Sequence, residues 1–342
     1  MKRLTVLFVF MIILSSVFAL KVALLLNGTL GDKSFMDSAA SGLFRAEKEL
    51  GVDGRIIEMY YDPTNWRPTL VDVSNQDYDV IIVGTFQLAA ILKDVAPEHP
   101  DKKYILFDAT MDYSKGAFEN VYSVLYKQNE GSFLAGALAA LLTQSNVKGI
   151  NDKKIIGFIG GMDIPVIKDF LVGYEAGAKY IDPEVEIKIA FLGTFKDPAR
   201  GKEAALTMFR YGVDVCFAVA GRAGLGVLEA AKERGAYAIG VDVDQAKALE
   251  EKDPQLASHI VTSMVKNVGL SLYRALERHL KGENIYGRVE KLGIAEGGVG
   301  LAKNEYYNSI VPEDIKKKIE ELEKALLAGK IKVPSFLKSG EE

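Results

Sequence analysis

The amino-acid sequence predicts an α/β protein made of two doubly wound parallel-sheet lobes with a ligand cleft between them. Short apolar runs alternate with longer amphipathic stretches along most of the chain, and strands separated by helices form parallel sheets covered on both faces. This alternation is interrupted near the middle by a turn-rich segment, residues 112–127. The length of 342 residues also suits two domains of ~100–200 residues each.

The first half of the chain begins with a strand and continues in regular alternation. We expect strands at residues 21–26, 55–60, 79–83 and 103–107. Helices are expected between them at residues 34–50, 66–74 and 88–96. The first helix has a periodic apolar face, a capping pattern of Ser34 followed by Asp37, and Gly51 as its stop.

The same rhythm resumes in the second half. We expect a helix at residues 130–143 and then strands at 155–159, 186–191, 214–219 and 237–241. Helices are expected at residues 165–180, 198–211 and 224–234. A further strand at 258–263, a helix at 265–280 and an amphipathic helix at 312–328 complete the prediction. The interruption at 112–127, with an isolated strand-like run at 120–125, favours two lobes over one closed barrel.

The N-terminus has the composition of an export signal. Lys2 and Arg3 precede an apolar run, which ends in small residues with Val17 and Ala19 at the two recognition positions. We predict a signal peptide at residues 1–19 and a periplasmic or other extracytoplasmic location. The apolar stretch is shorter than the ~20 residues of a spanning helix, so a retained membrane anchor is the alternative. No cysteine stands directly after this stretch, so we expect no lipid anchor on an N-terminal cysteine.

Composition narrows the possible functions. A net charge of −4 argues against nucleic acid as a partner, since phosphate binding needs clustered Lys and Arg. The single cysteine, Cys216, lies in an apolar run and is expected to be a buried hydrophobe. The three histidines are far apart and lack metal-ligand spacing. Neither a phosphate-binding P-loop nor a G-x-S-x-G elbow is present, so we predict a binding protein without a cofactor rather than an enzyme.

Polar residues and glycines follow the predicted strands. In open parallel sheets, ligands bind beyond the carboxyl ends of the strands. The residues at these ends include Asn27, Thr85 and Asp108 in the first half. The second half adds Gly161, Gly221 and Asp242. One glycine at such an end is an ordinary turn, but the repeated pattern predicts a ligand site.

The loops after the strands carry motifs that resemble a known family. They are Gly28-Thr29-Leu30-Gly31-Asp32-Lys33-Ser34-Phe35, Gly193-Thr194-Phe195-Lys196-Asp197-Pro198 and Gly240-Val241-Asp242-Val243-Asp244-Gln245. Together with Thr262-Ser263-Met264-Val265-Lys266, they resemble the basic membrane protein or purine nucleoside receptor family of substrate-binding proteins for ABC importers. The resemblance implies a type I periplasmic-binding fold, with two lobes, three crossovers and closure on the ligand. It implies two partners, a small-molecule nucleoside and an ABC permease in the membrane.

The resemblance also implies roles for individual residues. Phe35 and Phe195 would stack on the two faces of a purine, although Phe35 could instead belong to the core. Asp242 and Lys266 would hold the ribose hydroxyls, and Gly221 would offer its backbone.

Two more residues complete the expected site. Asp108 would bind the ligand directly or through water, and Asn27 would face the edge of the base. The aspartates Asp32, Asp197 and Asp244 are expected to be helix caps instead of ligand contacts.

The chain departs from the family pattern at three positions. Asn27 replaces a usual aspartate, which leaves the preferred base open. Met36 replaces an asparagine, and Arg222 replaces a glycine and could reach into the cleft. A sugar-binding protein of the same fold, a sensory ectodomain and a nucleoside hydrolase or nicotinamide-dependent reductase are the alternatives.

The crossovers that the resemblance implies divide the chain discontinuously. We expect the N-terminal lobe to contain residues 20–127 and 247–283. The C-terminal lobe is expected to contain residues 128–246 and 284–334.

Overall fold

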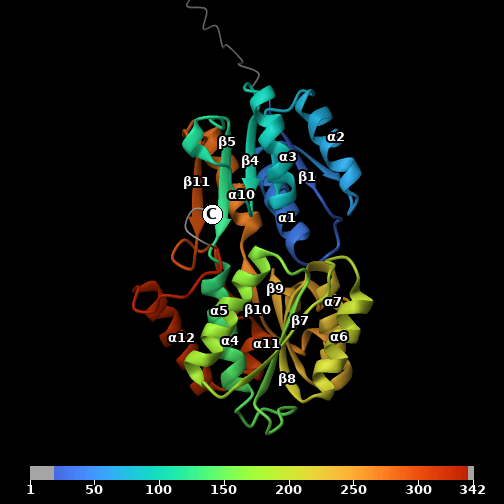
Figure 1. Cartoon of the computed structure of the whole chain (residues 1–342), viewed down its shortest axis with the longest axis vertical. Coiled ribbons are helices and arrows are strands. Elements are labelled where there is room, and N and C mark those ends of the chain that lie inside the picture. Colours follow the sequence, from blue (N-terminus) through green and yellow to red (C-terminus); the bar gives the residue numbers. More distant parts are fainter. Residues whose placement is uncertain (1–18, 338–342) are drawn as a thin grey trace, which may run out of the picture.

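Two stacked lobes, each built on one sheet, form the molecule (Figure 1). The computed structural model describes residues 19–337, so the predicted signal peptide at residues 1–19 lies almost wholly outside the described residues. The first sheet has six strands in the order β11-β5-β4-β3-β1-β2, and the second has six in the order β12-β10-β9-β8-β6-β7. Within the described residues, neighbouring strands pair in parallel except β10 and β12. The predicted fold class is confirmed.

The first lobe follows the predicted alternation. Its chain order is β1 (Lys21–Leu26), α1 (Phe35–Leu50), β2 (Asp53–Glu58), α2 (Pro63–Ser74), β3 (Val80–Gly84), α3 (Thr85–Glu98), β4 (Lys103–Phe107) and β5 (Val121–Tyr126). Helix α10 (Val268–Leu280) packs against α1, and β11 (Arg288–Leu292) pairs with β5. Strands β1 and β3 lie inside the sheet and are almost wholly buried, as expected for a sheet covered on both faces.

The second lobe repeats this plan. It begins with α4 (Gln128–Leu142), β6 (Ile155–Gly160), α5 (Pro165–Ile181), β7 (Glu186–Phe191), α6 (Pro198–Arg210) and β8 (Val213–Val219). It continues with α7 (Gly224–Arg234), β9 (Tyr237–Asp242), α8 (Gln245–Leu249), α9 (Pro254–Ala257) and β10 (Ile260–Lys266). Its last elements are β12 (Val299–Leu301), α11 (Glu305–Ile310) and α12 (Glu313–Leu327). Cys216 is buried in β8, and burial raises the pKa of its thiol.

The helix starts show which capping predictions hold. Asp197 and Asp244 accept backbone N–H groups at the starts of α6 and α8, as predicted. At α1 the Ser34 side chain caps nothing; instead, the Asp32 carboxylate accepts the backbone N–H groups of Ser34, Met36 and Asp37 at 2.9–3.1 Å. The predicted Ser34 cap is therefore wrong, because the serine hydroxyl has a partner elsewhere.

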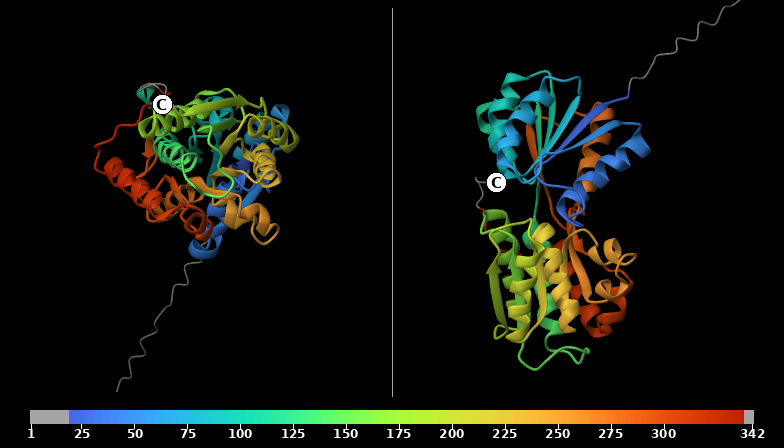
Figure 2. Two further views of the ribbon diagram at one scale, coloured as in Figure 1. Left: turned by 90° about the horizontal axis from the view of Figure 1, so that it is seen from below. Right: turned by 90° about the vertical axis from the view of Figure 1, so that its right-hand side faces the viewer.

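Three crossovers join the lobes, in agreement with the fold that the resemblance implies. The chain passes from β5 to α4, from β10 to α10 and from β11 to β12. The connections lie side by side at the waist of the molecule (Figure 2), where Lys127 N donates to Leu292 O at 2.9 Å and Asn267 N donates to Gly298 O at 2.8 Å. Rotation about these three short links would move one lobe relative to the other.

The predicted division into lobes is wrong in two segments. Strand β10, expected in the N-terminal lobe with residues 247–283, pairs with β9 in the second sheet. Strand β11, expected in the C-terminal lobe with residues 284–334, pairs with β5 in the first sheet. The predicted boundary between residues 246 and 247 comes before β10, whereas the second crossover lies at Asn267, between the end of β10 at Lys266 and the start of α10 at Val268. Strand β11 was not predicted, because its sequence Arg288–Leu292 is largely charged and contains no apolar run.

Helices α4 and α5 approach each other closely through glycines. A Cβ atom on Gly177 would lie 1.9 Å from Phe133 O, and one on Gly173 would lie 2.2 Å from Asn129 O. Backbone atoms cannot yield as a flexible side chain can, so these two helices can pack in this way only without side chains there.

We expect Gly177→Ala to lower the free energy of unfolding by about 1–3 kcal/mol, since overpacking forces the two helices apart. Gly300→Ala is the matched control, because a Cβ atom on Gly300 would have nothing within 4 Å. Thermal melts of the two ligand-free variants measure the difference. Equal melting temperatures for both variants would contradict the close packing.

Candidate ligand-binding site

A cavity of about 640 Å³ lies between the lobes, at the carboxyl ends of the strands. This volume is within the ~300–1,000 Å³ range of small-molecule sites. The structure brings every predicted site residue to its wall: Asn27, Phe35, Asp108, Phe195, Gly221, Asp242 and Lys266. The wall also contains residues that the sequence analysis did not assign, including Trp66, Phe86, Tyr126, Ile164, Phe170 and Leu337.

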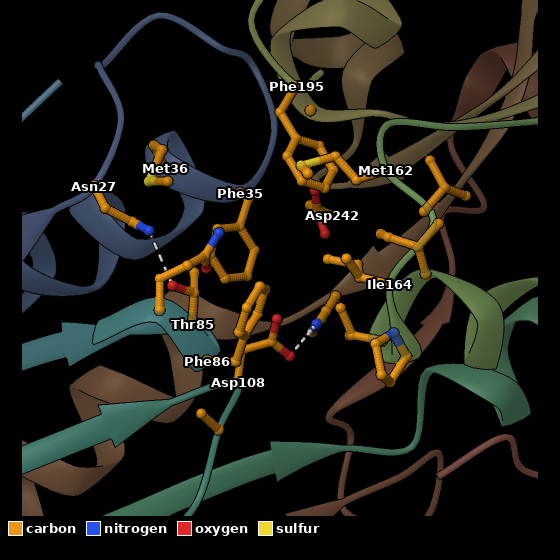
Figure 3. A pocket seen from close by; sticks show the side chains of 18 of the residues that line it. Asn27, Phe35, Met36, Thr85, Phe86, Asp108, Met162, Ile164, Phe195 and Asp242 are labelled. Carbon is orange, nitrogen blue, oxygen red and sulfur yellow. Dashed lines mark hydrogen bonds and ion pairs between the residues drawn. The ribbon is translucent and has the colours of Figure 1, made fainter. Parts of the chain in front are cut away.

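Two aromatic rings from opposite lobes line the cavity (Figure 3). Phe35, in the first turn of α1, packs on Phe107 with ring centroids 5.4 Å apart and planes tilted by 38°. Phe195 follows β7 in a loop, and its ring covers the backbone of Gly161, where a Cβ atom would lie 2.3 Å from the ring. Both rings are half-buried and pack partly against the core. Phe35 therefore combines the core and cleft positions that the sequence left open.

Lys266, at the end of β10, carries a buried ammonium group into the cavity. It forms an ion pair with Asp108, which follows β4 in the other lobe. The rings of Phe35, Tyr126 and Phe170 surround the ammonium, with centroids 5.0–5.4 Å from it. A buried charge requires a partner of opposite sign, and aromatic faces add further attraction. The pair therefore joins the two lobes across the cavity.

Asp242 ends β9 and is enclosed at the cavity wall. It accepts a hydrogen bond from Ser34 Oγ of the first lobe, which explains why this serine does not cap α1. Burial raises the pKa of Asp242 to about 7, although the nearby Lys266 ammonium opposes the rise. The group can therefore donate or accept hydrogen bonds near neutral pH.

Three of the cavity residues have left-handed backbone conformations. The φ angles of Thr85, Asp108 and Asp242 are 74°, 60° and 67°. Residues other than glycine adopt this region at some cost in free energy, and such strain concentrates at binding and catalytic sites. All three follow or end strands, so the conformation turns the chain sharply at the edge of the cavity.

Polar contacts close one side of the cleft. Gln245 Nε2 donates to Lys33 O at 2.8 Å, and Arg222 donates to Thr29 Oγ1 at 3.3 Å. Gly221, beside this arginine, has a φ of 53°. Arg222 therefore bridges the lobes at the wall of the cavity.

Asn27 lies at the cavity wall in the first lobe, directly after β1. Its Nδ2 donates to Thr85 Oγ1 at 2.9 Å, an interaction drawn in Figure 3. This contact orients the amide at the end of β1. An aspartate at this position would lack the donor.

Tyr126, Phe170 and Leu337 are among the cavity residues that the sequence did not indicate. The packing of Tyr126 and Phe170 around Lys266 depends on the assembled lobes, so no local pattern indicates it. Leu337 lies beyond the last predicted helix. Ser34 was not expected at the site either. It does belong to the Asp32-Lys33-Ser34-Phe35 motif, which carries the family resemblance and could have indicated a role there.

Two parallel-sheet lobes, three crossovers and a cavity between the lobes define a solute-binding protein with the type I periplasmic-binding fold. Comparison with known proteins specifies the family. The model described as "ABC transporter substrate-binding protein PnrA-like" matches residues 19–335. The chain belongs to this family, whose members are extracytoplasmic substrate-binding proteins of ABC transporters.

Two relatives match along most of their own length. Basic membrane protein A of Borreliella burgdorferi is 30% identical over 326 residues, which cover 94% of this chain and 90% of that protein. Basic membrane protein B of the same species is 32% identical, with 86% and 87% covered.

Solved structures share the fold. An ABC transporter solute-binding protein from Aeropyrum pernix has a TM-score of 0.81 at 30% identity, with 92% of this chain and 94% of that chain covered. An arabinose-binding protein from Geobacillus stearothermophilus has a TM-score of 0.60 at 15% identity, with 85% and 99% covered, and shows the fold alone.

Residues 19–337 contain neither a membrane-spanning helix nor a metal-binding cluster. The helices there are all too short or too polar to cross a bilayer. No cluster of three or more His, Cys, Asp or Glu in the same range is arranged to hold a metal ion.

The protonation of Asp242 should make stability depend on pH. In the folded protein the carboxyl keeps its proton up to a pKa of about 7, whereas an unfolded aspartate loses it near ~4. The folded state therefore binds more protons between these values, and the contribution of Asp242 to the free energy of unfolding falls as the pH rises through this window.

Asp242→Asn keeps the shape but cannot ionise. We expect this variant to gain several degrees in melting temperature relative to the wild type between pH 5 and pH 8, without ligand. Asp163→Asn, at an exposed carboxylate paired with Lys168, is the control and should show no such trend. A difference between D242N and wild type that stays constant across this range would show that Asp242 is ionised throughout.

Proposed function

We propose that the protein binds a purine nucleoside between its lobes and delivers it to an ABC permease without altering it. The observation that carries this proposal is the pair of rings, Phe35 and Phe195, which enter one cavity from opposite lobes. A flat heterocycle placed between them would contact both lobes at once, so that binding and closure would be coupled.

The chemistry of the cavity supports a nucleoside. Stacking on an aromatic side chain contributes ~1–3 kcal/mol per base. The ribose presents neighbouring hydroxyl groups, and one carboxylate can accept hydrogen bonds from both. Asp242 would hold them in this way while Lys266 donates to a sugar oxygen, so that the heterocycle and the pentose would each have matching partners.

A sugar is the second candidate, because the arabinose-binding protein shares the fold. Fold alone does not determine the ligand. The apolar side chains of the wall, such as Met162, Ile164 and Phe170, favour a ligand with a large apolar face over a free sugar.

Transport requires an open and a closed form. The three crossovers would act as the hinge, and the Asp108–Lys266 and Ser34–Asp242 contacts would be formed on closure. We propose that a cleaved signal peptide exports the protein and that the closed form docks on the permease. The cavity carboxylates already have partners, which suits binding better than acid–base catalysis.

Removal of either ring should weaken nucleoside binding. We expect Phe35→Ala and Phe195→Ala each to raise the Kd for purine nucleosides about tenfold or more, from the lost stacking. Phe44→Ala is the control, because Phe44 lies on the same helix as Phe35 but is 54% exposed and does not line the cavity. Calorimetric titration with adenosine, guanosine and inosine measures the effect.

Two outcomes would count against the nucleoside. The first is a wild-type protein whose melting temperature none of the three nucleosides raises. The second is binding of a sugar such as arabinose that survives both ring substitutions, since a hydrogen-bonded sugar does not need the stack.

Asn27 is proposed to contact the base edge, and Asn27→Asp should change base preference. A carboxylate accepts but cannot donate, whereas guanosine presents N–H donors along its edge. We expect the ratio of the Kd for adenosine to that for guanosine to rise about tenfold in N27D. Asp62→Asn, at an exposed cap outside the cavity, should leave the ratio unchanged. An unchanged ratio in N27D would remove Asn27 from the base-recognition site.

A further inference from the structure

The chain returns to the ligand cavity after its last helix. Beyond α12, residues 333–337, called here the C-terminal segment, pass over the starts of α4 and α5 in the second lobe. Asn129 Nδ2, in the first turn of α4, donates to the carbonyl groups of Val333 and Pro334 at 3.4 and 3.1 Å. In Figure 1 the red ribbon beyond α12 rises beside α5 to the level at which the lobes meet.

A buried carboxylate anchors this segment. Asp169 on α5 is 1% exposed, and its Oδ1 accepts hydrogen bonds from Ser335 Oγ at 2.7 Å and Phe336 N at 2.8 Å. Its Oδ2 accepts from Gln128 Nε2, also at 2.7 Å. A buried carboxylate is costly unless donors surround it, and hydrogen bonds to an ionised group are about twice as strong as neutral ones. The segment therefore supplies donors that Asp169 requires.

The anchor positions Leu337. Ser335 Oγ, which donates to Asp169, accepts a hydrogen bond from Leu337 N at 3.1 Å. The half-buried Leu337 side chain lines the ligand cavity together with Ile167 and Phe170 of α5. Phe170 follows Asp169 in sequence and faces the Lys266 ammonium. Two successive residues of α5 therefore have different partners: Asp169 binds the C-terminal segment, and Phe170 contacts the Lys266 ammonium.

Phe336 has a different position. Its ring is 43% exposed, lies 5.4 Å from Lys168 Nζ and does not line the cavity. Asp169 and Ser335 therefore position both Phe336 and Leu337, but only Leu337 lines the ligand cavity.

We infer that the C-terminal segment is a fixed wall of the ligand site, in which Leu337 contacts the ligand and limits its size while Asp169 and Ser335 are positioning residues. This inference rests on the proposed function for the identity of the ligand. It assigns ligand recognition to a part of the chain beyond the two-sheet scaffold.

Two shortened chains test the wall. A chain ending at Pro334 lacks Ser335, Phe336 and Leu337, and a chain ending at Leu337 keeps all three. We expect the first to bind adenosine, guanosine and inosine about tenfold or more weakly than the full chain, because the buried area of one Leu side chain is lost. The second is the matched control and should bind with the affinity of the full chain.

Single substitutions separate contact from folding. Leu337→Ala should weaken binding about tenfold, and Leu337→Trp should exclude ligands by filling the cavity, while both leave the ligand-free melting temperature unchanged. Phe336→Ala should retain wild-type affinity. Ser335→Ala should weaken binding less than Leu337→Ala, because it loosens Leu337 without removing it.

The outcomes distinguish this inference from the proposed function. If the full chain binds none of the nucleosides, the proposed function fails. If the full chain binds a nucleoside but both shortened chains bind it equally, or Leu337→Ala and Leu337→Trp keep wild-type affinity, the wall is overturned and the nucleoside site stands.

Discussion

The enclosed ammonium of Lys266 is the constraint around which the cavity is arranged. A buried cation must be matched by nearby negative charge. Asp108 provides it from the other lobe, and three aromatic rings complete its surroundings. Because Lys266 ends a strand of the second sheet and Asp108 follows a strand of the first, the ion pair joins the two lobes. The same charge lies near Asp242 and opposes the effect of burial on its pKa. In the proposed function, ligand hydroxyl groups would enter this network of buried charge.

The backbone holds these side chains at the edges of the sheets. Thr85, Asp108 and Asp242 adopt positive φ angles where their strands end. Such conformations cost about 1–3 kcal/mol each and persist where the surroundings impose them. The paired, buried strands on either side provide this rigidity. In the proposed function, rotation at the three crossovers would close the lobes on a site whose residues are already held in place.

Much of the fold could be predicted because central parallel strands are continuous apolar runs between amphipathic helices. Strands β1, β4 and β7 match the predicted residues, and most others differ by only a few residues. Strand β11 was missed because its Arg288–Leu292 sequence has no apolar run and depends on pairing with β5. The change from β10 to α10 was misplaced by about three residues, because β10 continues to Lys266 and α10 begins only at Val268. The local pattern around Asn267 does not show that the chain changes lobes there.

The alternation of strands and helices and the chemistry at the strand ends could be predicted, because both depend on residues close together in the chain. From this local pattern we could predict that Asn27, Asp108 and Asp242 lie at the carboxyl ends of their strands, where the cavity is found. Three other features could not be predicted: the lobes to which β10 and β11 belong, the hydrogen bond from Ser34 to Asp242 in place of a helix cap, and the position of Leu337 at the cavity. These outcomes depend on contacts between segments far apart in the chain, where burial and hydrogen-bond satisfaction outweigh local preference.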